Sequence, residues 1–427
     1  MIATAARRPC RVALAGFGTV GRSAARLLQQ APADVDLVAI LNRRVKSKRV
    51  DWIDPRVRWT ESFDELLDTG VDVLIELIGG REPAADWIRA ALERGISVVT
   101  ANKQVMAHEG PSLLAAAAEH GCQLRFEASV AGGVPVIRGI ESGLASDTLT
   151  RVAGILNGTC NYILTRMEQN GTSFDDALRE AQTLGFAEAN PSQDIDGFDA
   201  RAKLAVLAMV ALGIQAPPAA ITARSIAVVH PLDFQYAHRL DCTIRQVAWA
   251  VRTGEPGRLT GAVGPALVPL ASALARVNGS ENLVTVTGAF GGETSFGGRG
   301  AGGDPTAVAV VSDVLGIARG ARPPAKPPAA VTETVSSEFE TPYYVRFTVV
   351  DRPGIIAALA SVFADHEINI HAILQEPGFP AESRPFVVSL DAAPSGAVEA
   401  ALATIEAFEF HVSPPVAMPI LMPPEAG

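Results

Sequence analysis

The segment from Gly185 to Lys203 carries four carboxylates ahead of an apolar helical stretch. Asp199 and Lys203 are four residues apart, which places them on one helix face with the acid before the base. Leu204–Leu212 is almost wholly apolar, so the Lys203 ammonium should lie where solvent meets the core. An ammonium there could protonate or polarise a carbonyl oxygen as hydride arrives. The pattern fits equally an acidic helix N-terminus with an ordinary salt bridge.

Residues 16–21 read Gly-Phe-Gly-Thr-Val-Gly, a GxGxxG pattern between a short apolar run and a helical stretch. In such loops the first glycine permits the tight turn, the second lets backbone N–H groups approach a pyrophosphate, and the third lets the helix pack close to the strand. The pyrophosphate then lies at the positive end of the helix. With its strand and helix in place, the motif predicts a dinucleotide site rather than a turn without a ligand. The predicted cofactor residues are Gly16, Phe17, Gly18, Thr19, Val20 and Gly21.

The loop after the second apolar strand is basic. An NAD-preferring loop usually has an acid there, which binds the ribose 2′-OH. This chain instead has Arg43 and Arg44, which could pair with a 2′-phosphate. The loop therefore favours NADP, with NAD as the second option. The alternative is a solvated basic loop, since Lys46, Lys48 and Arg49 continue the positive run.

A second lysine, Lys103, follows the apolar strand Ser97–Thr100. Ligands of open parallel sheets collect at the carboxyl ends of the strands. We therefore expect Lys103 at the cofactor crevice. The alternative is a surface lysine after a strand.

Apolar strands alternate with amphipathic helical stretches over the first 130 residues. This alternation predicts an α/β fold, a Rossmann-type doubly wound parallel sheet covered by helices on both faces. The predicted strands are Arg11–Ala15, Leu37–Leu41, Val71–Leu77, Ser97–Thr100 and Leu124–Glu127.

Three further regions are predicted beyond the sheet. Residues 131–320 form an α+β catalytic and dimerisation domain, with 300–320 returning to the nucleotide domain. Residues 321–340 begin with a proline-rich stretch and form a stiff linker. Residues 341–427 follow a βαββαβ order, which predicts a small ferredoxin-like domain.

The amino-acid composition disfavours two classes of binding partner. The formal charge of −10 disfavours nucleic acid and anionic membranes, which both reward a basic surface. The four cysteines are far apart, as is typical of reduced thiols. The N-terminus lacks an apolar signal region, and the apolar runs are shorter than the roughly 20 residues of a membrane span. We therefore expect a cytoplasmic protein.

Several of these motifs, taken in order, resemble homoserine dehydrogenases over residues 10–320. They are the Gly16–Gly21 loop, Ala101–Lys103, Gly154–Thr159, the Gly185–Lys203 block and Gly300–Ala307. The resemblance implies reversible, NAD(P)-dependent interconversion of L-homoserine and L-aspartate 4-semialdehyde. The chain departs from many relatives at Ser295–Arg299, where those have a tyrosine and a proline.

The resemblance also implies residue roles. Lys203 would be the general acid/base, and Lys103 a second catalytic lysine beside substrate and nicotinamide. Glu188 and Asp199 would bind the substrate, supported by Asp194. The remaining matching residues are Gly158 and Thr159 near the substrate, and Gly185, Gly302 and Gly303 near the cofactor.

A monovalent cation, sodium or potassium, is a further implication of the resemblance. Its ligands would be backbone oxygens at Glu127, Val130, Gly132 and Val134. Taken alone, the segment is typical of a glycine-rich turn leading out of a strand.

The C-terminal region resembles an ACT-type regulatory domain through its Asp351–Gly354 turn and its Asn369-Ile370 strand start. Such domains pair side by side, which implies a homodimer, and bind small amino acids near that turn. L-threonine is the effector we expect, and a domain that only assists dimerisation is the alternative.

Two other functions fit parts of the sequence. One is another NADP-linked amino-acid oxidoreductase, of the aspartate or malate type. The other is a non-catalytic sensor of nucleotide and amino acid. A sensor predicts loss of a catalytic lysine, whereas Lys103 and Lys203 are both present.

Overall fold

The computed structural model describes residues 8–31, 33–253, 258–321, 330–332 and 334–422. The chain forms two compact units, and each gathers three separate segments. Unit 1 comprises Met1–Val152, Ala202–Ala220 and Glu281–Glu333, and unit 2 comprises Ala153–Arg201, Ile221–Ser280 and Thr334–Gly427. The chain passes from one unit to the other within strand β7 (Leu149–Ile155) and within helix α10 (Phe198–Leu207).

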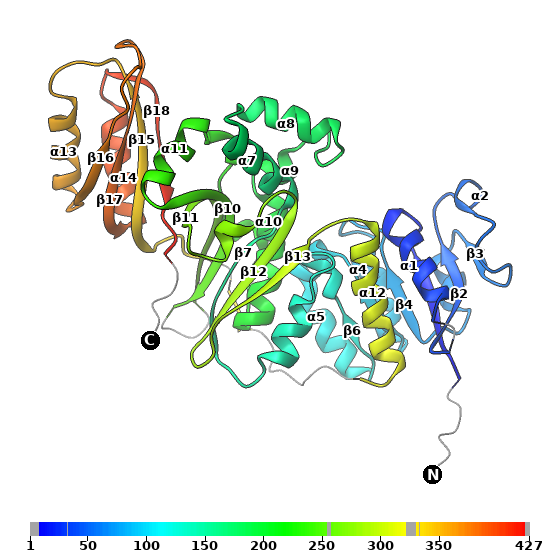
Figure 1. Ribbon diagram of the computed structural model, residues 1–427. Helices are drawn as coiled ribbons and strands as arrows, with labels where there is room; N and C mark the ends of the chain where they lie inside the picture. The colour runs from blue at the N-terminus through cyan, green and yellow to red at the C-terminus, as the bar shows by residue number, and fades with distance from the viewer. Residues whose placement is uncertain (1–7, 32, 254–257, 322–329, 333, 423–427) are drawn as a thin grey trace. The chain divides into compact units, whose positions relative to one another are not determined.

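A parallel six-stranded sheet in the order β3-β2-β1-β4-β5-β6 organises unit 1 (Figure 1). This is the Rossmann strand order, so the predicted fold class is confirmed. The strands are β1 (Cys10–Ala15), β2 (Val35–Leu41), β3 (Arg58–Thr60), β4 (Val73–Glu76), β5 (Ser97–Thr100) and β6 (Leu124–Arg125). The helices between them are α1 (Thr19–Gln29), α2 (Val45–Lys48), α3 (Phe63–Leu67), α4 (Ala84–Glu93) and α5 (Lys103–Glu119). The edge strand β3 is an addition to the predicted strands.

Unit 1 has a core in which the sheet packs against both early and late segments of the chain. Val12 and Leu14 of β1 share this core with Val310 and Val314 of α12 (Gly303–Ala318). Helix α12 lies beside α1, so the chain returns to the parallel sheet 274 positions after the end of α1 (Figure 1).

The rest of unit 1 consists of short elements and one hairpin. The hairpin pairs β12 (Glu281–Gly288) with β13 (Gly292–Arg299) in antiparallel register. The others are α6 (Val136–Arg138), with a wide helical turn continuing over Gly139–Gly143, and β8 (Ile214–Gln215), which pairs with β14 (Ala330–Val331).

In unit 2, the first part joins a helical layer to long antiparallel strands. The helices are α7 (Gly158–Asn170), α8 (Phe174–Thr183), α9 (Ser192–Ile195) and α11 (Pro231–Arg239). Strand β10 (Cys242–Arg252) pairs with β11 (Leu259–Pro269), and β11 also pairs with the short β9 (Thr222–Ala223).

The second part of unit 2 is an antiparallel four-stranded sheet in the order β16-β17-β15-β18. Its elements are β15 (Glu340–Val349), α13 (Ile355–Asp365), β16 (Ile370–Leu374), β17 (Arg384–Pro394), α14 (Ser395–Glu406) and β18 (His411–Pro419). This is the predicted βαββαβ order. One sheet face packs on α13 and α14, while Tyr344 and Val387 of the other face join the core around α7 and α11.

No helix in the described ranges is long and apolar enough to span a membrane.

Candidate active site

The glycine loop after β1 has a backbone that excludes side chains. Gly16 has φ +104°, and a Cβ there would lie 2.6 Å from the Leu77 carbonyl oxygen. At Gly18 a Cβ would meet nothing within 4 Å, so this face of the loop is open to a phosphate group. The side chain of Phe17 is buried against Trp52 and Trp59, which anchors the loop in the core.

A second glycine turn lies against this loop. Gly302 has φ +115°, and a Cβ on Gly303 would come within 2.9 Å of Thr19 Cγ2. The Ser23 hydroxyl donates a 2.6 Å hydrogen bond to Asp304 Oδ1, which fixes the first turn of α12 against α1. The N-terminal ends of two helices therefore converge beside the predicted phosphate site. The role of Asp304 was missed by the sequence analysis, because the bond spans 281 positions.

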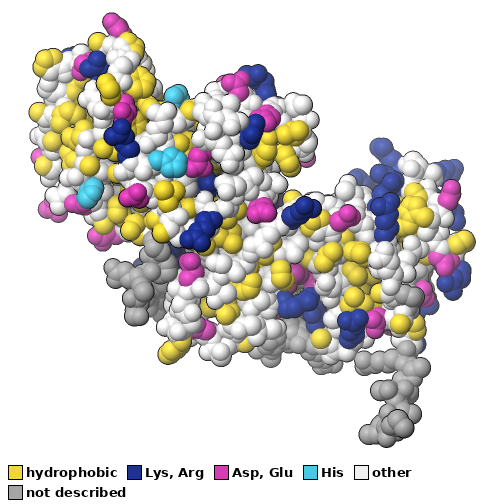
Figure 2. All heavy atoms as spheres, viewed as in Figure 1, with side chains coloured by type: hydrophobic (Ala, Val, Ile, Leu, Met, Phe, Trp, Pro, Cys, Tyr) yellow, Lys and Arg dark blue, Asp and Glu magenta, His cyan; other side chains and the backbone are white. Residues whose placement is uncertain are grey.

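The predicted 2′-phosphate residues lie on the exposed rim after β2. Arg43 and Arg44 are both exposed, and Arg44 immediately precedes α2. Lys and Arg side chains gather over the α1–α2 end of unit 1 (Figure 2). The adjoining Asn42 accepts a 3.4 Å hydrogen bond from the Phe17 N–H through Oδ1, linking this rim to the glycine loop.

Lys103 is the first residue of α5, just past the carboxyl end of β5. Its neighbour Asn102 caps the helix by accepting a 3.2 Å hydrogen bond from the Val105 N–H. The Asn102 amide also donates a 2.6 Å hydrogen bond to the Gly80 carbonyl. These bonds hold the backbone of Lys103 at the sheet edge where ligands collect.

A buried carboxylate completes this network. Glu76 ends β4 and is fully buried, and it accepts a 2.6 Å hydrogen bond from the Thr100 hydroxyl. Burial raises the pKa of Glu76, although the hydrogen bonds it accepts act in the opposite direction. Glu76 was missed as a site-forming residue. The sequence did contain a signal for Glu76, because an acidic residue at the end of an otherwise apolar strand is unusual.

The segment predicted to hold a cation is a tight turn in unit 1. Ala131 and Gly132 both have φ +52°, and a Cβ at Gly132 would lie 2.5 Å from the Gly300 carbonyl oxygen. The Glu127 carboxylate accepts backbone hydrogen bonds of 2.7 Å from Ile137 and 2.9 Å from Arg138. Burial raises the pKa of Glu127 to about 7.

In unit 2, Asn157 joins two of the predicted substrate carboxylates. Its Nδ2 donates a 2.6 Å hydrogen bond to Asp194 Oδ1 and a 2.9 Å hydrogen bond to Asp199 Oδ2. Its Oδ1 accepts a 2.9 Å hydrogen bond from the Cys160 N–H and so caps α7. One amide therefore fixes a helix start and a carboxylate pair. Asn157 was named only within a motif, although an Asn before Gly-Thr was a visible cap signal.

The other predicted residues of unit 2 surround the start of α7. A Cβ on Gly158 would lie 2.7 Å from the Ser280 carbonyl oxygen, so only glycine fits. The Thr159 hydroxyl donates a 2.8 Å hydrogen bond to the Phe186 carbonyl. This bond ties α7 to the exposed segment that carries Gly185 and Glu188.

Asp199 and Lys203 both lie on α10, one turn apart. Asp199 is 8% exposed and Lys203 is half-buried. The pair thus has the one-turn helical spacing that the sequence predicts. A second carboxylate, Asp194, reaches Asp199 through the shared Asn157 amide.

A phosphate-binding glycine loop on a Rossmann sheet indicates dinucleotide chemistry. Lys203, half-buried one helical turn after the hydrogen-bonded Asp199, is the kind of residue that can donate a proton. Together they define the class of nicotinamide-dependent oxidoreductases.

Comparison with protein-family models identifies the family within this class of oxidoreductases. The NAD-binding domain of homoserine dehydrogenase matches residues 16–127, the homoserine dehydrogenase model matches residues 135–315, and the ACT domain matches residues 343–407. The chain belongs to the homoserine dehydrogenase family, whose members are oxidoreductases acting on a CH–OH group.

Individual relatives agree with this assignment. A homoserine dehydrogenase of Mycobacterium tuberculosis is 40% identical over 383 residues, covering 86% of this chain and 87% of the relative. The crystal structure of a homoserine dehydrogenase from Thiobacillus denitrificans has a TM-score of 0.87 at 32% identity, covering 97% and 98% of the two chains. A hyperthermophilic archaeal homoserine dehydrogenase in complex with NADPH has a TM-score of 0.62 at 27% identity, covering 72% of this chain and 97% of its own.

Proposed function

We propose that this chain interconverts L-homoserine and L-aspartate 4-semialdehyde with NADP(H), using Lys203 as the general acid/base. The observation that carries the proposal is the Asn157 amide, which donates hydrogen bonds to both Asp194 and Asp199; Asp199 lies one helical turn before Lys203 on α10. This arrangement supplies fixed negative charge for a cationic substrate and a proton donor on the same helix.

The proposed residue roles follow from charge and exposure. The Glu188 carboxylate is exposed and suits the substrate ammonium, while Asp199 orients the substrate and is held by Asn157. Lys203 donates a proton to the forming alkoxide and removes it in the reverse direction. Lys103 adds positive charge at the carboxyl edge of the sheet. When bound, the nicotinamide supplies or accepts the hydride.

The cofactor would bind to the glycine-rich loops of unit 1. The pyrophosphate would be held by backbone N–H groups of Gly16–Gly21, with Gly303 beside Thr19 and Gly302 directly before it. We propose Gly185 as a further cofactor-binding residue. Arg43 and Arg44 would pair with the 2′-phosphate of NADP. The NADPH complex of the archaeal relative supports this choice.

A monovalent cation, sodium or potassium, fits the Glu127–Val134 turn. Val130 and Gly132 are buried residues, and their carbonyl oxygens accept no hydrogen bond from the described residues. Buried carbonyls without donors are the groups that a hard cation satisfies. We therefore propose Glu127, Val130, Gly132 and Val134 as the backbone ligands. The cation would hold this turn against Gly300, away from the reacting carbon.

The ACT domain is the proposed site of regulation and of subunit pairing. The ACT domain is proposed to bind L-threonine near Asp351–Gly354 and to pair with its copy in a homodimer. Its presence supports feedback control by a small amino acid. The four cysteines form no disulfide bond in the described part of the chain, which suits a reducing compartment, so we propose a cytoplasmic location.

The direct test is homoserine oxidation with NADP and NAD side by side, with and without threonine. We expect faster turnover at low NADP than at low NAD, and inhibition by threonine. Malate, aspartate and other amino alcohols serve as control substrates. Turnover of a control substrate in preference to homoserine would contradict the assigned substrate.

A further inference from the structure

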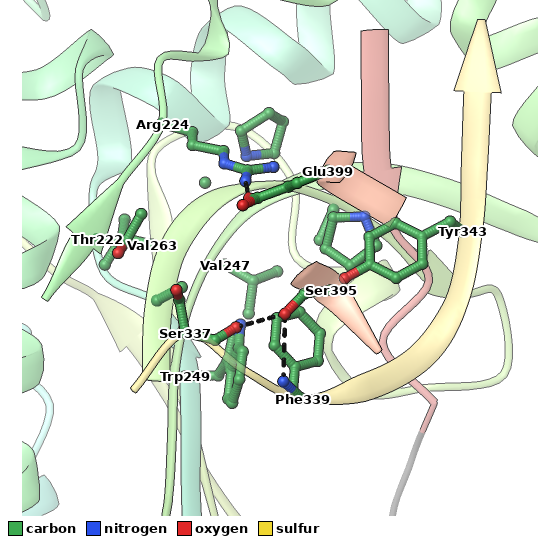
Figure 3. A pocket seen from close by; sticks show the side chains of 15 residues that line it. Thr222, Arg224, Val247, Trp249, Val263, Ser337, Phe339, Tyr343, Ser395 and Glu399 are labelled. Atoms are coloured by element: carbon green, nitrogen blue, oxygen red, sulfur yellow. Dashed lines mark hydrogen bonds and ion pairs between the residues drawn. The ribbon is translucent and has the colours of Figure 1, made fainter. Parts of the chain in front are cut away.

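Strand β10 carries a buried glutamine near its centre, among side chains that are mostly apolar. Gln246 is 2% exposed, and its Nε2 donates a 3.3 Å hydrogen bond to the Asp194 carbonyl. The neighbouring side chains Val247 and Trp249 line a small cavity with Tyr343 of the ACT domain (Figure 3). Successive residues of a strand point to opposite faces, so Gln246 points away from this cavity and toward α9.

Helix α9, which accepts this hydrogen bond, is too short to hold its own position. It spans only Ser192–Ile195, and a single helical turn is not stable without contacts from elsewhere in the fold. Asp194 lies within this turn, and its carboxylate is one of the two that the Asn157 amide joins. The position of that carboxylate therefore depends on what holds the backbone of the turn.

Side chains from three other segments hold this backbone. The Asp194 carbonyl accepts the hydrogen bond from Gln246 and a 3.1 Å hydrogen bond from the Cys160 thiol. The Ser225 hydroxyl donates a 3.2 Å hydrogen bond to the Ile195 carbonyl. Of these three donors, only Gln246 lies on a strand, so it connects the turn to the sheet.

The Gln246 side chain is unfavourable to bury. Its Oε1 is buried and accepts no hydrogen bond from the described residues. An amide oxygen buried in this way lowers the stability of a fold, because its hydrogen bonds to water are lost without replacement. A methionine of similar length would avoid that loss. The glutamine is therefore explained better by the hydrogen bond it donates to Asp194 than by the stability of the strand.

We propose that Gln246 is a positioning residue, which fixes Asp194 and through it the carboxylate pair that binds the substrate. The inference rests on the proposed function, because the role of the pair in substrate binding is part of that function. Without the hydrogen bond from Gln246, α9 would shift and the 2.6 Å hydrogen bond from Asn157 to Asp194 would lengthen. The consequence is weaker substrate binding with an unchanged dinucleotide loop, since Gly16–Gly21 belongs to unit 1.

Gln246→Met tests the inference, because methionine keeps the length of the side chain and removes the donor. We expect the KM for homoserine to rise about threefold to tenfold, the range that corresponds to one neutral hydrogen bond. The KM for NADP should stay unchanged. Urea unfolding should show no loss of stability, because the unsatisfied buried oxygen is removed together with the donor. A glutamine with a merely structural role would give the reverse, a loss of stability with an unchanged KM.

Gln215→Met is the matched control. Gln215 also donates a side-chain hydrogen bond to a backbone carbonyl, of 3.0 Å to His108, and it lies in unit 1. Its replacement should leave the KM for homoserine unchanged.

Combining Gln246→Met with Asp194→Asn tests whether Gln246 acts through Asp194. The double variant should show a rise in the homoserine KM smaller than the product of the two separate rises, because both substitutions impair the same group. A rise equal to the product would show that the two residues act independently, and would overturn the inference.

An unchanged homoserine KM in Gln246→Met, or a KM that rises only with a loss of stability, also overturns the inference. Asn157→Ser separates this failure from failure of the proposed site. If Asn157→Ser raises the KM and Gln246→Met does not, the carboxylate site stands and only the role of Gln246 fails. If neither substitution raises the KM, the proposed substrate site fails as well.

Discussion

At the residue scale, the side chain of Asn157 connects the start of α7 to the two proposed substrate carboxylates, Asp194 and Asp199. The Asn157 amide bonds two carboxylates and a helix N-terminus at once. Two like charges brought close repel each other, and a shared donor offsets that repulsion. Asn157 is therefore a positioning residue for Asp199.

Replacing Asn157 should impair substrate binding more than cofactor binding. We expect Asn157→Ser to raise the KM for homoserine about tenfold or more, because both charged hydrogen bonds from Nδ2 are lost. Serine keeps an oxygen that can cap α7, whereas Asn157→Ala should also lower the free energy of unfolding by about 0.5–2 kcal/mol. Steady-state kinetics and urea unfolding measure the two effects. An unchanged homoserine KM in the serine variant would remove Asn157 from the site.

The preference for NADP over NAD is also proposed to depend on a few side chains. Arg43→Ala combined with Arg44→Ala should raise the KM for NADP about tenfold or more, since ionised hydrogen bonds to the 2′-phosphate are lost. The KM for NAD should stay near its original value. Lys46→Ala removes a nearby positive charge and serves as the control. Equal losses for NADP and NAD would show that the two arginines attract any dinucleotide without recognising the 2′-phosphate.

At the element scale, the ends of β4 and β5 and the start of α5 position Lys103 in the proposed cofactor site. The ends of β4 and β5 are joined by the Glu76–Thr100 hydrogen bond, and α5 begins at Lys103 directly after them. The apolar strand pattern predicted β4 and β5, and with them the position of Lys103 just past β5. The Glu76–Thr100 bond could not be predicted, because it depends on the parallel register of two strands.

The buried Glu76 gives a pH dependence with a definite sign. Burial raises its folded pKa above the ordinary value of 4.5, so the folded protein binds more protons than the unfolded chain above that pH. Its contribution to stability is complete below pH 4.5 and is lost as the pH rises through the folded pKa. The free energy of unfolding of the native protein, relative to Glu76→Gln, should therefore fall with rising pH. Urea unfolding across this range measures it.

Glu65→Gln is the opposite control. The hydrogen bond from the Thr60 hydroxyl lowers the pKa of Glu65. Its contribution to stability is present above pH 4.5 and is lost as the pH falls through the folded pKa. A relative stability of native Glu76 that rises with pH would contradict the assigned burial effect.

At the scale of the whole molecule, the chain builds its units from segments far apart in sequence. Hydrophobic periodicity and turn residues predicted the Rossmann sheet and the βαββαβ order, since these depend on local pattern. The packing of the ACT sheet within unit 2 could not be predicted in this way. It depends on Asp233, which is fully buried and accepts hydrogen bonds from Tyr344 at 2.6 Å and Arg346 at 2.7 Å.

Breaking this junction should destabilise unit 2. Asp233→Ala leaves the nearly buried Arg346 without its carboxylate, which should cost about 3 kcal/mol or more. Asp391→Ala removes the partner of an exposed histidine pair and should cost about 0.5 kcal/mol or less. Urea unfolding monitored by circular dichroism compares the two variants. Equal small losses would show that Asp233 contributes little to the docking of the ACT sheet.

The proposed role of Lys203 is tested by the turnover number of Lys203→Ala in NADP-dependent homoserine oxidation, measured together with its affinity for NADPH. We expect turnover to fall about 10²–10⁴-fold with unchanged NADPH affinity, because only the proton-transferring group is lost. Arg201→Ala, on the same helix with its guanidinium over the Phe198 ring, should retain most of its activity. A Lys203→Ala enzyme with near-normal turnover would contradict the assigned chemistry.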